Sequence, residues 1–315
     1  MTVHRWLSSN SYNFSLRQDD LTRHCLFLIL ATRLGEAPVQ KTIIDCRDLY
    51  FTYEEEQDWI LNNLSFQAYR GEWIAILGTN GSGKSTLARM LNALLIPTSG
   101  TTEVDGLRTD EEDHIWEIRQ KAGMVFQNPD HQFVAATVRD DIAFGLENAG
   151  ISREQMIERI QAASEQVAID DHLDAEPHRL SGGQKQRAAI AGILALRPDI
   201  MIFDESTSML DPEGRKEVMK TMNELHERGF TLIMITHDLQ EAMQADRVVF
   251  MEKGTIVKDM STEAFFQDPA FLMDRNFHLP YFLEVQAYLN DNKQQAYMLD
   301  EDEWVKMLCK LHSTT

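Results

Sequence analysis

Residues 73–85 read WIAILGTNGSGKS, and this stretch decides the fold of the chain. It is apolar up to its first glycine, which predicts a buried strand, and residues 85–95 (STLARMLNALL) predict a helix that ends before Pro97. The turn between them fits the pattern GxxxxGK[ST], in which backbone N–H groups and a helix N-terminus surround a phosphate group. The stretch therefore predicts a phosphate-binding loop made of Gly78, Thr79, Asn80, Gly81, Ser82, Gly83, Lys84, Ser85 and Thr86.

The side chains of this loop and of a second strand have distinct expected roles. Lys84 is expected to bridge the β- and γ-phosphates of ATP, and Ser85 to bind Mg²⁺. Residues 200–205 (IMIFDE) predict a buried strand that ends in Asp204 and Glu205, at the sheet edge where α/β proteins place ligands. We expect Asp204 to hold Mg²⁺, directly or through water, and Glu205 to polarise the water that attacks the γ-phosphate. Such an acidic pair is usually a solvated turn, but beside a phosphate loop it favours ATP hydrolysis.

Composition and charge narrow the class of protein. The chain has 315 residues, 43% of them hydrophobic, which is enough for a substantial core. Its 30 Lys and Arg against 50 Asp and Glu give a net charge of −20, which argues against a nucleic-acid partner. The cysteines, Cys25, Cys46 and Cys309, match no metal-ligand spacing, and the longest apolar run, residues 25–32, is too short to cross a bilayer. We therefore expect a globular protein with reduced thiols that does not itself span a membrane.

Changes in amino-acid pattern along the chain predict its division into domains. Residues 1–41 carry no identifiable chemistry and are expected to be a poorly ordered extension or an upstream mis-start rather than a signal peptide. Residues 42–265 form the predicted main domain, which begins with β-branched and aromatic segments typical of an antiparallel β layer. Within it, residues 131–196 are mostly helical in pattern. Residues 266–315 predict a separate helical C-terminal extension, for which a role in dimerisation is one interpretation and a packed amphipathic tail the other.

A second glycine-containing motif stands directly before a helical stretch. Leu180, Ser181, Gly182, Gly183 and Gln184 (LSGGQ) precede KQRAAIAGILAL. Ser181 can cap that helix while the two glycines allow close approach of the backbone, which would make a second anion site at a helix N-terminus. The alternative is a plain helix cap with a turn.

With its phosphate loop and LSGGQ, the chain is identified as a member of the ABC ATPases. The resemblance implies an α/β fold in which a RecA-like core sheet carries an antiparallel β layer, a helical subdomain and a small C-terminal helical extension. In this family LSGGQ clamps the γ-phosphate that the opposite subunit holds. One chain with one phosphate loop and one LSGGQ then owns two half-sites, so a second ABC ATPase subunit is the implied partner.

The resemblance also assigns roles to residues that would be unremarkable alone. Gln127, in VFQNPD, matches the loop that contacts Mg²⁺ and the attacking water, and His237, in ITHD, matches the switch histidine that holds the γ-phosphate. Asp211, in SMLDP, matches the loop that communicates between subunits. Tyr53, in FTY, stands where the family stacks an aromatic ring on adenine, although a core aromatic of the β layer fits its position nearly as well.

Longer phrases resemble one group within that family. GMVFQNPDHQFVAATVRDDIAFGLEN, PHRLSGGQKQRAAIAGILALRPDI and DESTSMLDPEGR are similar to the ATPase subunits of energy-coupling factor (ECF) transporters, in the first of their two types. This implies a heterodimer of similar ATPases, peripheral on the cytoplasmic face of the cell membrane, beneath a transmembrane coupling protein. It also implies uptake of vitamins or other micronutrients, metal ions included, that separate membrane substrate-binding proteins capture. In the resembling family a separate protein selects the transported compound, so the resemblance names no single substrate.

Other classes of protein share some of these motifs. Another ABC importer ATPase would use the same motifs, and a homodimer would satisfy them because this chain contains every half-site element. A soluble ABC protein that acts in translation or DNA repair is less favoured, since the sequence shows no tandem cassette, coiled-coil arm or zinc module and its net charge is −20. A non-enzymatic regulatory subunit would be expected to lack Glu205 or LSGGQ, and both are present.

Overall fold

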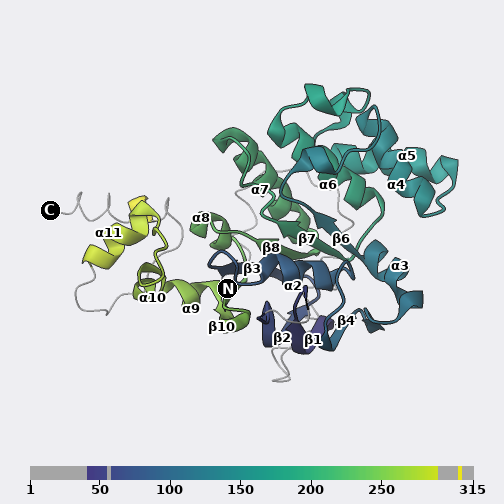
Figure 1. Cartoon of the computed structure of the whole chain (residues 1–315). Coiled ribbons are helices and arrows are strands. Elements are labelled where there is room, and N and C mark those ends of the chain that lie inside the picture. Colours follow the sequence, from purple (N-terminus) through teal and green to yellow (C-terminus); the bar gives the residue numbers. More distant parts are fainter. Residues whose placement is uncertain (1–40, 55–57, 290–303, 307–315) are drawn as a thin grey trace, which may run out of the picture. The chain divides into compact units, whose positions relative to one another are not determined.

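The computed structural model describes residues 41–54, 58–289 and 304–306, so the expected N-terminal extension lies outside the described residues except for Lys41. The described chain mixes strands and helices, with one run of helices between β6 and β7 and another after β10 (Figure 1). The strands are β1 (Thr42–Phe51), β2 (Leu61–Tyr69), β3 (Trp73–Gly78), β4 (Ser99–Val104), β5 (Leu107–Arg108), β6 (Ala122–Val125), β7 (Ile200–Asp204), β8 (Thr231–Ile235), β9 (Arg247–Glu252) and β10 (Thr255–Ser261). The α-helices are α2 (Lys84–Leu91), α3 (Glu112–Lys121), α4 (Val138–Asn148), α5 (Arg153–Gln166), α6 (Gly182–Ala195), α7 (Pro212–Glu227), α8 (Leu239–Ala242), α9 (Thr262–Phe266), α10 (Pro269–Met273) and α11 (Tyr281–Leu289). Short 3-10 helices are η1 (Pro129–His131), η2 (Asp170–His172) and η3 (Pro177–Arg179).

Two sheets carry the described part of the chain. One is four-stranded, in the order β2-β1-β4-β5, and all its pairings are antiparallel, as the β-rich segments from residue 42 predict. The other is six-stranded, in the order β10-β9-β3-β8-β7-β6, and is parallel except for β10. Because parallel strands end at the same edge, the ends of β3, β7 and β8 come together there. The expected α/β fold class, with a core sheet, an antiparallel layer and a helical subdomain, is confirmed.

The six-stranded sheet separates two hydrophobic cores. Successive strand residues point to opposite faces, so on β3 Trp73 and Leu77 enter one core while Ile74 and Ile76 enter the other. Every residue of β3, β7 and β8 is buried. This burial on both faces explains why continuous apolar runs, rather than alternation, mark these strands in the sequence.

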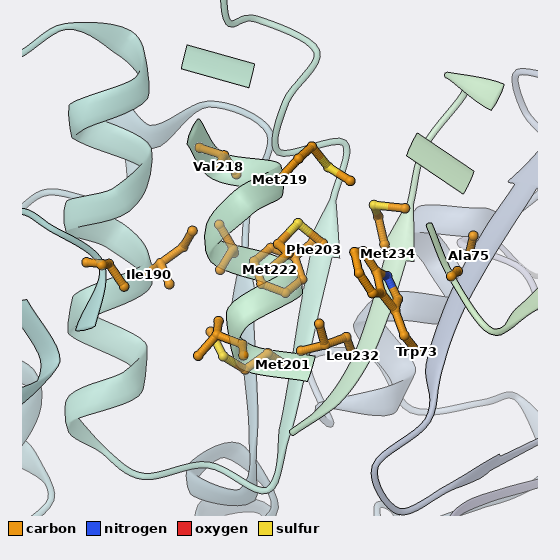
Figure 2. Packing of buried hydrophobic residues seen from close by; sticks show 14 of the residues in the cluster. Trp73, Ala75, Ile190, Met201, Phe203, Val218, Met219, Met222, Leu232 and Met234 are labelled. Carbon is orange, nitrogen blue, oxygen red and sulfur yellow. The ribbon is translucent and has the colours of Figure 1, made fainter. Parts of the chain in front are cut away.

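Helices cover one face of this sheet, and α2 and the antiparallel sheet cover the other. Figure 2 shows the helical side, where side chains of β3, β7 and β8 pack against α6 and α7. On the opposite side, Leu87 and Met90 of α2 share a core with Ile43 and Ile44 of β1. The phosphate-loop helix therefore lies between the two sheets, which holds its N-terminus rigidly.

The ends of two functional helices differ from the sequence-based expectation. Helix α2 ends at Leu91 rather than Leu95, because Ala93 adopts a left-handed backbone (φ 55°) and the N–H groups that follow bond to the carbonyl oxygen of Arg89. Helix α6 begins at Gly182, inside LSGGQ, where Ser181 caps it. The signature glycines are thus part of the first helical turn.

The C-terminal region is helical where it is described. Helices α9, α10 and α11 follow β10, and Pro280 stands just before α11, where a proline is tolerated. Leu272, Phe282 and Leu283 belong to the same buried cluster as Phe203 of the core sheet. Residues 290–303 and 307–315 lie outside the described residues, and the division at residue 265 stays a prediction. Within the described part of the chain, no helix is both long and apolar enough to cross a bilayer.

Candidate active site

The loop between β3 and α2 can be built only with glycine at two positions. Gly78 has φ 151°, and a Cβ there would lie 2.1 Å from the carbonyl oxygen of Met251. Gly83, the residue that precedes α2, has φ 96°, and a Cβ there would lie 2.9 Å from the carbonyl oxygen of Ile60. The loop lines a cavity of about 290 Å³ together with Ile60 and Glu205. The glycines of the motif are therefore required by close backbone packing as well as by the turn.

Lys84 lies at the centre of this loop with only 6% of its surface exposed. Its Nζ donates hydrogen bonds of 3.0 Å to the carbonyl oxygens of Gly78 and Thr79. Burial lowers the pKa of Lys84, and the nearby charges of Glu205 and Asp204 oppose that shift. A buried cation in a ring of backbone groups provides a binding site for phosphate oxygens.

Ser85 and Asp204 meet at the edge of the sheet. The Ser85 hydroxyl donates a 2.8 Å hydrogen bond to Oδ1 of Asp204, which is only 6% exposed. Burial raises the pKa of Asp204, and the Ser85 hydrogen bond acts in the opposite direction. A hydroxyl and a carboxylate are oxygen ligands of the kind that Mg²⁺ prefers, so the pair fits the ion that the sequence predicts.

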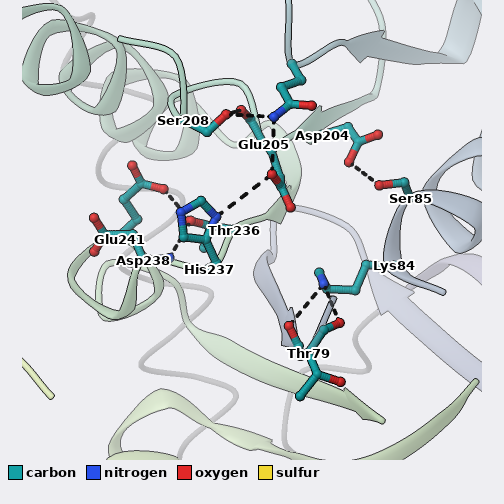
Figure 3. Close-up of polar contacts among 12 residues, drawn as sticks. Thr79, Lys84, Ser85, Asp204, Glu205, Ser208, Thr236, His237, Asp238 and Glu241 are labelled. Carbon is teal, nitrogen blue, oxygen red and sulfur yellow. Dashed lines mark hydrogen bonds and ion pairs between the residues drawn. The ribbon is translucent and has the colours of Figure 1, made fainter. Parts of the chain in front are cut away.

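Glu205 is held next to Asp204 in an unusual backbone conformation. Its φ is 49°, in the left-handed region, and its N–H donates to the carbonyl oxygen of Ile235 at 3.0 Å. This conformation turns its side chain toward Gln127 and His237, as Figure 3 shows for the histidine. The Gln127 Nε2 lies 3.4 Å from Oε2 of Glu205, and the His237 Nδ1 lies 3.9 Å from the same oxygen. A non-glycine residue kept in this region is common at functional sites because the surrounding structure must hold it there.

Ser208 joins this group although no sequence pattern predicts it. Its hydroxyl accepts a 3.1 Å hydrogen bond from Nε2 of Gln127 and donates a 2.8 Å bond to the carbonyl oxygen of Glu205. The only signal in the sequence is its position between Glu205 and Asp211. Ser208 therefore links the turn that holds Glu205 to the loop that carries Gln127.

Tyr53 lies at the rim of the loop with 53% of its surface exposed. Its ring contacts Phe51 edge-on, with the ring centroids 4.9 Å apart, and its hydroxyl lies 3.5 Å from Oγ1 of Thr86. Phe51 is buried in the β layer, whereas Tyr53 is not. Tyr53 is therefore not a buried core residue of the β layer, and its stacking on adenine stays a prediction.

The LSGGQ segment forms its own structure at the start of α6. The Ser181 hydroxyl accepts from the Gln184 N–H at 3.3 Å, and the Gln184 side chain accepts from the Ser181 N–H at 2.9 Å, which together make a capping box. A Cβ on Gly183 would lie 2.8 Å from Cα of Gly214 in α7, so this glycine allows α6 and α7 to touch. Leu180 is buried in the helical core. Asp211 caps α7 by accepting from the Gly214 N–H at 3.2 Å.

The structure thus brings some of the predicted residues together and leaves others apart. Lys84, Ser85 and Glu205 line the loop cavity, and Asp204 is hydrogen-bonded to Ser85. Gln127 and His237 lie next to Glu205. Among the described residues, no hydrogen bond or ion pair joins residues 180–184 to the phosphate loop. One chain therefore presents a phosphate loop and a separate LSGGQ surface.

Comparison with known proteins agrees with this geometry. Residues 61–208 match the family model described as ABC transporter. The energy-coupling factor transporter ATP-binding protein EcfA1 of Halalkalibacterium halodurans is 50% identical over 266 residues, which cover 84% of this chain and 96% of that protein. The protein of the same name from Bacillus subtilis is 52% identical over 278 residues, covering 87% of this chain and 99% of that protein.

Two solved structures are also similar to this chain. The structure of cbiO1 from Clostridium perfringens, described as part of the ABC transporter complex cbiONQ, has a TM-score of 0.69 and 33% identity, and covers 79% of this chain and 100% of that chain. A dimeric structure of the ATP-binding cassette MJ0796, described as a post-hydrolysis state bound to ADP and Pi, has a TM-score of 0.62 and 27% identity, and covers 70% of this chain and 99% of that chain. The chain belongs to the ABC transporter family, in the group of ATP-binding proteins of energy-coupling factor transporters, and is an ATPase coupled to transport.

Proposed function

We propose that this chain hydrolyses MgATP at an interface with a second ABC ATPase subunit and so drives an ECF-type importer of vitamins or other micronutrients. The observation that carries the proposal is that Lys84, Ser85 and Glu205 line one cavity, with Asp204 bonded to Ser85, while LSGGQ lies elsewhere on the same chain. Each chain then has the residues that bind ATP and activate the attacking water, but it needs a second chain to close the site.

The side chains of the cavity divide the chemistry between them. Lys84 and the loop N–H groups bind the β- and γ-phosphates, and Ser85 with Asp204 holds Mg²⁺. Bound Mg²⁺ supplies neutralisation of the phosphate charge. Glu205 accepts a proton from the attacking water and His237, next to it, holds the γ-phosphate. Gln127, anchored to Ser208, orients the water.

A second ABC ATPase completes the site in this proposal. The capping box uses the N–H groups of Ser181 and Gln184, so the N–H groups of Gly182 and Gly183 at the start of α6 are the ones that a phosphate would meet. MJ0796, which shares this fold, is described as dimeric with ADP and Pi. We propose a heterodimer with the second ATPase type, because the two curated relatives described above are named as one numbered type, EcfA1.

A groove formed partly by residues 130–136, which follow Gln127 in the chain, supports attachment to a transmembrane coupling protein. It has a volume of about 390 Å³ and is lined by Asp130, Phe133, Ala135, Ala136, Glu176, Pro177 and His178. Val134 and Phe144 are large apolar side chains exposed in the same part of the chain. A helix from the membrane partner seated in this groove would place the chain peripherally on the cytoplasmic face, with separate membrane proteins to capture the substrate.

Co-purification tests this proposal. A tagged full-length chain is extracted with detergent from membranes of its native host, the bound proteins are identified by mass spectrometry, and the ATPase activity of the eluate is measured. We expect a second ABC ATPase, a polytopic membrane protein and one or more small membrane proteins that bind a vitamin or another micronutrient. A chain recovered alone, or with ribosomes, would overturn the transporter assignment even if it hydrolysed ATP.

A further inference from the structure

Glu241 of α8 is a buried carboxylate to which the proposed mechanism gives no role. It is only 3% exposed, and its Oε2 accepts a 2.5 Å hydrogen bond from Oγ1 of Thr236. Thr236 directly precedes His237, and its hydroxyl also accepts from the N–H of Asp238 at 3.0 Å. Burying a carboxylate is unfavourable unless its partners compensate. The burial of Glu241 next to the His237 loop (residues 236–238) therefore indicates a structural or functional role.

The second partner of Glu241 comes from another helix. Arg215 lies in the first turn of α7, and its Nε is 3.7 Å from Oε1 of Glu241. Another nitrogen of the same guanidinium donates a 2.7 Å hydrogen bond to Oδ2 of Asp238. In the described part of the chain, neither Nε of Arg215 nor Oε1 of Glu241 has a hydrogen-bond partner. The two atoms face each other slightly beyond hydrogen-bond distance, so a small shift of either helix would close or open the pair.

The first turn of α7 borders open space and is bonded to Asp211. A groove of about 790 Å³ between α7 and α8 is lined by Leu210, Pro212, Arg215, Asp238 and Glu241 among others, which leaves space for the Arg215 side chain to adjust. Asp211 caps α7, and its carbonyl oxygen accepts from the N–H of Arg215 at 2.9 Å. A displacement of the Asp211 loop (residues 208–212, SMLDP) would therefore shift the backbone of Arg215, whose guanidinium faces Glu241.

We propose that Glu241 is a positioning residue for His237, which it holds through Thr236 and couples to the Asp211 loop through Arg215. Given the proposed function, on which this role rests, contact of a second subunit with the Asp211 loop sets the position of His237 relative to Glu205. Figure 3 shows Glu241 and Asp238 on one side of His237 and Glu205 on the other. Closing the Arg215–Glu241 pair makes the His237 loop rigid, and opening it loosens the loop.

A double-mutant cycle tests this role in the full-length chain, purified with the partners that accompany its tag. We expect Glu241→Gln to lower kcat about tenfold, with KM for ATP changed less than about twofold, because the loop loses its charged anchor while the ATP-binding residues are untouched. In a His237→Ala background, measured under single-turnover conditions, Glu241→Gln should cause no further decrease. Glu224→Gln is the matched control, since Glu224 lines the same groove and, among the described residues, pairs only with Lys220, at 3.8 Å.

A second variant keeps the test sharp if Glu241→Gln lowers the melting temperature. Arg215→Lys keeps the positive charge at a partly exposed position but cannot reach Asp238 and Glu241 with two nitrogens, and should lower kcat at least about threefold, again only when His237 is present. Equal losses with and without His237, or an unchanged kcat in both single variants, would overturn the positioning role. Failure of the proposed function would look different, because the wild-type complex itself would then lack ATP turnover.

Discussion

The hydroxyl of Ser85, at the start of α2, donates a 2.8 Å hydrogen bond to Oδ1 of Asp204, at the end of β7, although the two residues are 119 positions apart. The contact exists because β3, which leads into α2, lies one strand away from β7, with β8 between them. This hydrogen bond joins the phosphate-binding loop to the strand that carries Asp204 and Glu205, and it places a hydroxyl and a carboxylate oxygen side by side.

Ser85→Ala should weaken the binding of Mg²⁺ rather than the binding of nucleotide. Removal of one oxygen ligand is expected to raise the Mg²⁺ concentration for half-maximal ATPase activity by at least about tenfold. The measurement is a Mg²⁺ titration of ATPase activity at saturating ATP. Affinity for ATP in EDTA is the internal control and should not change, and an unaltered Mg²⁺ titration would remove Ser85 from the metal site.

Glu205→Gln should abolish rapid turnover and leave ATP bound. Loss of a general base lowers kcat by about 10²–10⁴-fold, while the contacts to the phosphates from Lys84 and the loop are kept. Steady-state ATPase assays and fluorescence titration with an ATP analogue measure the two effects separately. A kcat within about threefold of the wild type would show that another group activates the water.

Asp204→Asn should stabilise the chain when nucleotide and metal are absent. Burial raises the pKa of Asp204 above its ordinary 3.8, so its contribution to stability is complete below pH 3.8 and is lost as the pH rises through the folded-state pKa. At pH 7.5 the buried carboxylate is therefore a net cost that asparagine removes, and the melting temperature in EDTA should rise by about 2 °C or more. The gain should shrink as the pH approaches 4.

A carboxylate with the opposite shift provides the control for this prediction. The hydrogen bond from Arg108 lowers the pKa of Asp110, so its contribution to stability is present at neutral pH and is lost as the pH falls through the folded-state pKa. Asp110→Asn should therefore give no gain in melting temperature at pH 7.5. If Asp204→Asn also gave none, the desolvation of Asp204 would be smaller than its burial indicates.

Gly183→Ala should separate α6 from α7 and destabilise the chain. The added Cβ would lie 2.8 Å from Cα of Gly214, a contact with backbone that cannot move aside easily, and the free energy of unfolding should fall by about 1–3 kcal/mol. Gly192→Ala, in the same helix, meets nothing within 4 Å and should raise it by about 0.5–1 kcal/mol because alanine favours helix. Chemical denaturation of both variants compares them, and equal effects would mean that the helices are not in close contact at Gly183.

Tyr53→Ala should weaken ATP binding without altering the chemical step. Loss of one aromatic platform removes about 1 kcal/mol, which corresponds to about a fivefold rise in KM for ATP with kcat kept. Tyr53→Phe keeps the ring and loses only the 3.5 Å contact with Thr86, so its KM should stay within about twofold of the wild type. A larger loss for phenylalanine than for alanine would exclude stacking as the role of this residue.

The amino-acid sequence by itself determined the parts of this protein that depend on neighbours along the chain. The phosphate loop is a continuous strand, turn and helix, and its glycines, Lys84 and Ser85 act through backbone directions set within a few residues. The cap of α6 by Ser181 and Gln184 is local in the same way. Burial on both faces marks β7 and β8 as apolar runs, so these strands of the six-stranded sheet could be predicted individually.

Only the tertiary structure decided which of these parts touch. The partnership of Gln127 with Ser208, the contact of Gly183 with Gly214 and the facing of Arg215 and Glu241 all join segments that the sequence keeps apart. Short polar residues such as Ser208 occur in many turns, and Glu241 alone looks like an ordinary residue of a helix. Their roles arise from the order of the strands and the packing of α6, α7 and α8, because a hydrogen bond or an ion pair forms only when folding brings both partners within a few ångströms.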